Sequence, residues 1–105
     1  MNYISYFFGG IFFANAIPHI VSGMMGHPFQ SPFAKPSGEG LSSSTVNVLW
    51  GFFNAMMAYF LILHVGVFDL YSGLDVFVLG LGSFLAALFN AHHFGKFNGG
   101  NSPSS

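Results

Sequence analysis

Amide and imidazole side chains interrupt three otherwise apolar stretches of this sequence, and they could do chemistry there. They are Asn15, His19, Asn54, Asn90 and His93. An imidazole can bind a metal ion or haem, and a carboxamide can bind a neutral polar solute. Asparagines within a membrane often only join helices, but an ionisable residue there is a functional candidate by default. His19 is therefore the residue of greatest interest.

A metal or haem site is one possible use of these histidines. His19 and His93, with His27 as a further candidate, could supply imidazoles, and Glu39 is the carboxylate expected nearby. Structural zinc usually takes four ligands in closely spaced Cys or His pairs, which this sequence does not have. Haem held between His19 and His93 is the other alternative. The sequence leaves the identity of any cofactor open.

The composition indicates an integral membrane protein. Of 105 residues, 52% are hydrophobic and only 5% are charged, with a mean hydropathy of +0.60. A soluble domain usually carries about 25% charged residues. The net charge of −1 argues against a nucleic-acid partner, and the lack of cysteine excludes disulfides and thiolate ligands.

Three apolar segments, at about 3–25, 45–66 and 74–94, are each long enough to span a membrane. About 20 helical residues cross a hydrocarbon core of about 30 Å, and a backbone in lipid must satisfy its own hydrogen bonds. The sequence therefore predicts an all-α membrane protein with three transmembrane helices in an up-down bundle. We expect one domain over 1–95 and a disordered tail over 96–105.

The connection over 26–44 is long and rich in proline. Prolines recur at every fourth position from Pro28 to Pro36, which forbids a continued helix and favours extended or turn geometry. Phe29 and Phe33 are too apolar for a free linker, so we expect them to pack back on the helix ends or to enter the membrane interface. A loop of this length is more often functional than neutral.

The few charges suggest an orientation. Lys35 and Lys96 lie on the side of the long loop and the C-terminus, whereas Asp69 and Asp75 lie on the other side. The positive-inside rule then places the loop and the C-terminus in the cytoplasm and the N-terminus outside.

Alternating spans bring the polar groups into the same half of the bilayer. The predicted site consists of Asn15, His19, Asn54, Asn90 and His93, with four loop residues as its cover. The loop residues are His27, Gln30, Lys35 and Glu39.

Helical periodicity supports a shared site. Asn47, Gly51 and Asn54 fall on one face of the second segment, and Gly80, Ser83 and Ala87 on one face of the third. Small residues at such spacing allow membrane helices to approach closely, so we expect the small, polar faces to meet. Trp50 does not lie at an obvious helix end, so we expect its indole N–H to have a partner within the bundle.

The runs Asn15–His19, Phe29–Ala34, Gly40–Ser43 and Asn47–Gly51 resemble small bacterial integral membrane proteins that have no assigned activity. The resemblance covers most of the chain except the tail. It implies a bacterial inner membrane and supplies no catalytic or ligand-binding residues.

The function favoured by the sequence is that of an accessory or assembly subunit of a membrane complex. No nucleophile–base pair, paired carboxylates or phosphate-binding loop points to an enzyme. The alternatives are a homo-oligomeric transporter of a small polar solute and a histidine-based metal or haem protein. In each case we expect the lipid bilayer, and either further copies or other membrane subunits, as partners.

Overall fold

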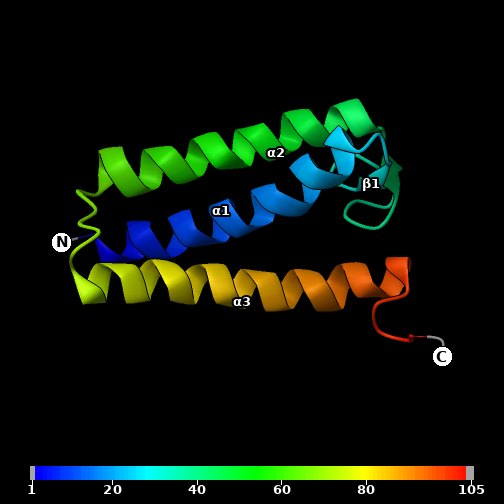
Figure 1. The fold of residues 1–105 in the computed structure, drawn as a ribbon. Coiled ribbons are helices and arrows are strands. Elements are labelled where there is room, and N and C mark those ends of the chain that lie inside the picture. The colour runs from blue at the N-terminus through cyan, green and yellow to red at the C-terminus, as the bar shows by residue number, and fades with distance from the viewer. Residues whose placement is uncertain (1, 104–105) are drawn as a thin grey trace.

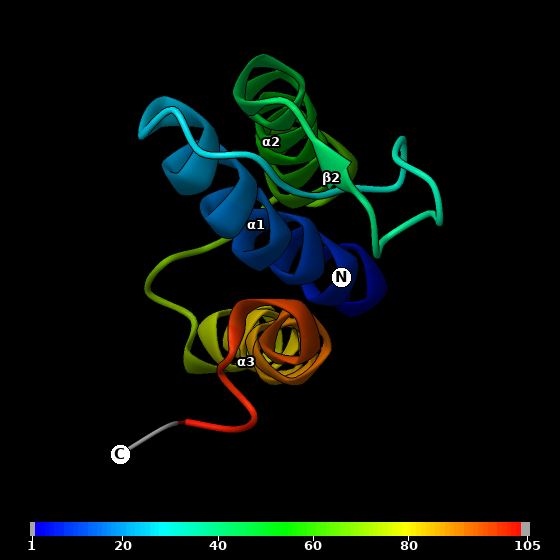
Figure 2. The same ribbon diagram turned by 90° about the vertical axis from the view of Figure 1, so that its right-hand side faces the viewer.

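Helix α1 (Tyr3–Met24) lies between the two other long helices of the computed structural model, which describes residues 2–103 (Figures 1 and 2). Helix α2 (Ser44–Tyr59) continues as the π-helix η1 (Phe60–Val65), and α3 covers Gly73–Asn98. In Figure 1, α1 and α3 run in one direction and α2 runs in the other. Both α2 and α3 pack on α1 and hardly touch each other. The contacts that hold the helices together are therefore made mainly by α1.

All three helical segments are long and apolar enough to cross a membrane. They contain 22, 22 and 26 residues, with α2 and η1 counted as one segment. Large apolar side chains such as Phe52, Met56 and Leu88 are exposed on their outer surfaces, as expected where lipid replaces water. The predictions of an all-α chain and of three candidate membrane spans are confirmed.

Serine side chains cap the beginnings of α2 and α3. The Ser43 hydroxyl accepts from the backbone N–H of Val46 at 3.2 Å, and the Ser72 hydroxyl accepts from that of Asp75 at 3.2 Å. These caps satisfy amide groups that have no partner within the helix. They explain why both helices begin within one residue of the positions that the sequence predicts.

The end of α3 differs from the prediction. The helix continues to Asn98 and ends at Gly99, whose φ of 82° is the left-handed conformation that glycine adopts without strain. Gly95, which directly follows the predicted segment of about 74–94, is buried within the helix, and Asn101 donates its backbone N–H to the Gly95 carbonyl at 3.3 Å. The helix thus extends about four residues past the predicted end at about residue 94, and residues 104–105 of the predicted tail lie outside the described residues.

The long loop contains a short hairpin. Strand β1 (Phe29–Gln30) pairs antiparallel with β2 (Leu41–Ser42), with Phe29 opposite Ser42. Between the strands, the backbone N–H of Gly38 donates to the Ser31 carbonyl at 2.8 Å. The loop is thus folded on itself, and it lies at the end of the molecule where α1 and α3 end and α2 begins (Figure 1).

Glycines bring the backbones of α1 and α3 into direct contact. A Cβ atom at Gly10 would collide with the Leu79 carbonyl, and one at Gly82 would collide with the Phe7 carbonyl. The Ser83 hydroxyl uses this closeness to donate to the Gly10 carbonyl at 3.0 Å. The interface between α1 and α3 is therefore built on small residues, as close membrane helix packing requires.

The predicted small-residue face of α3 is only partly correct. Ser83 packs on α1 as expected, but Gly80 and Ala87 are exposed and Gly82 is buried in their place. The spacing of small residues along α3 does not identify its packed face, because the face is set by where the Gly10 and Gly82 backbones meet the facing helix.

Candidate functional site

His19 and Asn47 form the most deeply buried polar contact of the protein. Their side chains are 2% and 0% exposed, and His19 Nδ1 lies 2.7 Å from Asn47 Oδ1. The Asn47 amide nitrogen donates to the carbonyls of Phe29, Ser42 and Ser43 at 3.0–3.2 Å. Because the amide nitrogen is committed as the donor, Oδ1 must accept, and His19 carries its proton on Nδ1.

Aromatic rings surround the His19 imidazole. The ring centroids of Phe29, Trp50 and Phe94 lie 5.5, 6.4 and 5.8 Å from that of His19, all in edge-to-face arrangements. Nε2 of His19 forms no hydrogen bond with the residues that the structure describes. The His19 imidazole is therefore held by one short hydrogen bond and by aromatic packing.

A chain of amides crosses the three helices. Asn90 Nδ2 on α3 donates to Asn15 Oδ1 on α1 at 3.3 Å, and Asn15 Nδ2 donates to Asn54 Oδ1 on α2 at 2.9 Å. Asn54 Nδ2 then donates to the Trp50 carbonyl at 2.8 Å. Each amide in this chain orients the next, and α1 supplies the central link.

The loop is attached to α3 by two further hydrogen bonds. His93 Nε2 donates to the Gly38 carbonyl at 2.7 Å, and Asn98 Nδ2 donates to Gln30 Oε1 at 3.0 Å. Gln30 is only 3% exposed. The Gln30 side chain and the Gly38 carbonyl thus fix the position of the loop over the ends of the helices.

The structure distributes the predicted site residues over two neighbouring clusters. Asn15, Asn54 and Asn90 form the amide chain, whereas His19 and His93 lie near each other because both rings contact Phe94, at 5.8 and 5.2 Å between centroids. No hydrogen bond joins the two clusters among residues 2–103. The predicted residues are close together, but they do not converge on one point.

The predicted loop cover needs correction. Gln30 is buried, whereas the side chains of His27, Lys35 and Glu39 are exposed. The hairpin pairing turns Gln30 inward toward Asn98, and the rest of the loop extends outward into its own turns. The three exposed residues therefore do not enclose the His19 cluster.

Asn47 is the important residue that the site prediction did not include. It shares a helical face with Gly51 and Asn54, and this pattern was the available signal. Its three carbonyl partners could not be foreseen, because they belong to the hairpin and to the helix start. For Trp50 the prediction was wrong, since its buried Nε1 has no hydrogen-bond partner among residues 2–103.

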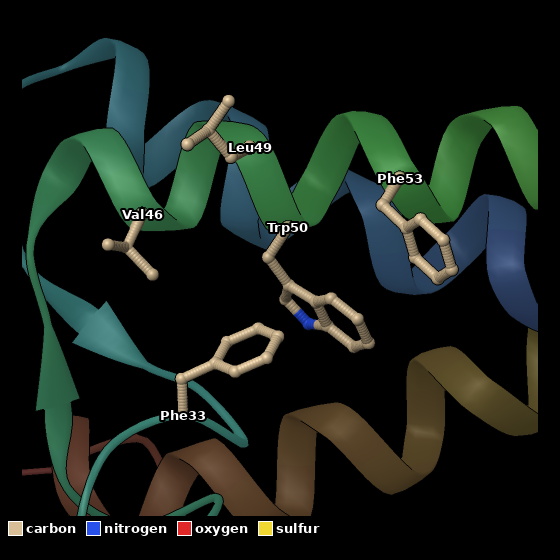
Figure 3. A pocket seen from close by; sticks show the side chains of 5 residues that line it. All are labelled: Phe33, Val46, Leu49, Trp50 and Phe53. Atoms are coloured by element: carbon tan, nitrogen blue, oxygen red, sulfur yellow. The ribbon is translucent and has the colours of Figure 1, made fainter.

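Two cavities lie on the flanks of this half of the protein. One has a volume of about 530 Å³ and is lined by Phe33, Val46, Leu49, Trp50 and Phe53 (Figure 3). The other, of about 360 Å³, lies between α1 and α3, and Asn15 and Asn90 are part of its lining. Within residues 2–103, no three histidine, aspartate or glutamate side chains are grouped to hold a metal ion.

The opposite end of the protein carries its own polar cluster. The Asp75 carboxylate is 5% exposed and accepts from the backbone N–H of Asp69 at 3.1 Å, and Asn2 Nδ2 donates to the Val65 carbonyl at 2.6 Å. Asn2, Asp69 and Asp75 line a cleft of about 350 Å³ together with Tyr6, Val67 and Ser72. The hydrogen bonds close the connection between η1 and α3 against the start of α1.

Comparison with protein-family models, with curated proteins and with solved structures finds no match for this chain.

Proposed function

We propose that this protein is a non-catalytic accessory or assembly subunit of a membrane complex, and that it associates with other membrane helices laterally, in the plane of the membrane. The support is the use made of its polar side chains. His19 is hydrogen-bonded to Asn47, and Asn47 in turn to the Ser43 carbonyl. Asn54 accepts a hydrogen bond from Asn15. These hydrogen bonds hold the helices and the loop together. Exposed apolar surfaces on all three helices are then available for lipid and for partners.

The strongest support for this proposal comes from the Asn90 side chain. It gives one N–H to Asn15, but its Oδ1 forms no hydrogen bond with any described residue. The side chain is half-buried in the cleft between α1 and α3, whose apolar lining residues are Ile11, Leu85, Ala86 and Phe89. An amide oxygen without a partner in hydrocarbon is costly, so a donor from another membrane helix would stabilise it.

We further propose the setting of this subunit. It lies in a bacterial inner membrane in an up-down arrangement, with the Pro-rich loop and the C-terminus in the cytoplasm and the N-terminus outside. The positions of Lys35 and Lys96 on one side and of Asp69 and Asp75 on the other support this orientation.

The test is to purify the protein from its native membrane in a mild detergent and to measure mass, metal content and absorption spectrum. We expect co-purification with a larger membrane partner in fixed ratio and no bound chromophore. A haem absorption band or stoichiometric metal would overturn the proposal in favour of a cofactor protein. A homodimer without either would favour transport.

A pair of variants tests the role of Asn90 in association. Asn90→Leu removes the amide and should weaken partner binding between about threefold and twentyfold, the range for one amide hydrogen bond between membrane helices. Phe84→Leu changes an exposed residue of α3 that does not line the cleft and should leave partner binding unchanged. Thermal unfolding of both variants shows whether the helices remain assembled. Equal partner binding by Asn90→Leu and wild type would contradict the proposed interface.

A further inference from the structure

The cavity of about 530 Å³ beside α2 is lined only by carbon-rich side chains. Val46, Leu49, Trp50 and Phe53 follow the spacing of one helical face, and Phe33 reaches this face from the loop (Figure 3). Pockets for small ligands have volumes of about 300–1,000 Å³ and are mostly apolar. Because α2 is a candidate membrane span, this groove opens where hydrocarbon chains are the surrounding solvent.

The indole N–H of Trp50 gives the groove one polar feature. Nε1 is buried and has no hydrogen-bond partner in the described part of the chain, and it lies on the ring edge turned toward Phe33 (Figure 3). The two rings are edge-to-face with centroids 5.2 Å apart, and an aromatic face is a weak acceptor. Phe33 itself is 64% exposed, so its displacement would open Nε1 to an occupant of the groove. A buried donor without an acceptor points to a missing partner.

The occupant must offer a free acceptor oxygen as well as a hydrocarbon chain. A second helix fits this requirement poorly, because its backbone carbonyls already accept within the helix. A phospholipid fits it well, because each acyl chain begins at an ester carbonyl that has no donor of its own.

Charge selects the class of phospholipid. The two cationic residues, Lys35 and Lys96, lie at the loop end of the molecule, and Lys35 is two positions beyond Phe33. Asp69 and Asp75 lie at the opposite end, which leaves Glu39 as the single carboxylate among the described side chains of the loop end. A lysine near the membrane surface attracts anionic headgroups.

We propose that the groove binds one acyl chain of an anionic phospholipid. The chain lies against Val46, Leu49 and Phe53, its ester carbonyl accepts a hydrogen bond from Trp50 Nε1, and Lys35 is near its phosphate. This binding site is independent of the association surface at Asn90, which lies between α1 and α3.

The single tryptophan of the chain provides a direct probe. The full-length protein, labelled with ¹⁵N-tryptophan in detergent, should give one indole N–H signal. Titration with phosphatidylglycerol should shift that signal downfield and saturate, and native mass spectrometry should show one retained lipid. Phosphatidylcholine with the same chains should bind about fivefold more weakly, and Lys35→Gln should remove this preference.

Variants of the groove separate binding from general contact with lipid. Val46→Phe fills the groove and should weaken phosphatidylglycerol retention about tenfold. Leu63→Phe adds the same ring at an exposed position outside the groove and should retain lipid as the wild type does. Trp50→Phe keeps an aromatic wall but removes the donor, and it should bind more weakly than wild type. Equal retention by Val46→Phe and wild type, or an indole signal that moves only when a second copy binds, would overturn the proposal.

Discussion

His19 Nδ1 donates to Asn47 Oδ1 across 2.7 Å, and this hydrogen bond joins the central helix α1 to the first turn of α2. Asn47 extends this contact to the loop, since its amide nitrogen donates to the carbonyls of Phe29, Ser42 and Ser43. One buried pair therefore fixes α1, α2 and both strands of the hairpin relative to one another.

Replacement of Asn47 should strongly destabilise the fold. Asn47→Ala leaves the His19 N–H and the carbonyls without their partner, and each unpaired buried group costs about 1–3 kcal/mol. We expect a loss of about 3 kcal/mol in the free energy of unfolding, measured in detergent by the fluorescence of Trp50. Asn47→Asp has the same shape but cannot donate, so it should be at least as destabilising.

His27→Ala is the control for that measurement, because the His27 side chain is exposed. Its effect should lie within about 0.5 kcal/mol. If Asn47→Ala were as mild as His27→Ala, the pair with His19 would not hold the loop.

Alanine at the glycines between α1 and α3 should separate these helices. A Cβ at Gly10 or Gly82 meets a carbonyl oxygen of the facing helix, and overpacking of this kind costs about 1–3 kcal/mol. Gly80→Ala is the matched control, since a Cβ there meets nothing within 4 Å. It should be neutral or stabilising by up to about 1 kcal/mol, because alanine favours helix over glycine. Thermal unfolding measures the stability of the three variants. If Gly80→Ala were the least stable of them, the close packing of α1 on α3 would be refuted.

Asn15 and Asn54 should be energetically coupled. Their hydrogen bond of 2.9 Å predicts that the double variant with alanine at both positions loses less stability than the two single variants together. Amide pairs of this kind in membranes contribute about 0.6 kcal/mol on average and about 1.7 kcal/mol at most. A double-mutant cycle in reversible unfolding measures this coupling, and purely additive effects would show that the contact contributes nothing.

Loss of His93 should loosen the loop without unfolding the helices. His93→Ala removes the hydrogen bond to the Gly38 carbonyl, worth about 1 kcal/mol, so amide exchange over residues 35–40 should quicken about fivefold. His92→Ala changes an exposed neighbour and should leave this exchange unchanged. Faster exchange in both variants would indicate a general effect on the end of α3.

The helices and their starting points could be predicted from the sequence, because they depend on local properties. Runs of apolar residues set the spans, and Ser43 and Ser72 provide caps wherever the helices pack. The face with Asn47, Gly51 and Asn54 also followed from periodicity, and all three residues are buried.

The partners of these side chains were decided by the tertiary structure alone. Hydrogen bonds such as those from Asn98 to Gln30 and from His93 to Gly38 join residues 68 and 55 positions apart, and no local pattern encodes such distances. The central position of α1 likewise depends on which glycines allow the closest backbone approach. The sequence by itself thus determined where the spans and the polar groups lie along the chain. Only the packing of three helices around α1 decided that these groups bind one another and the loop.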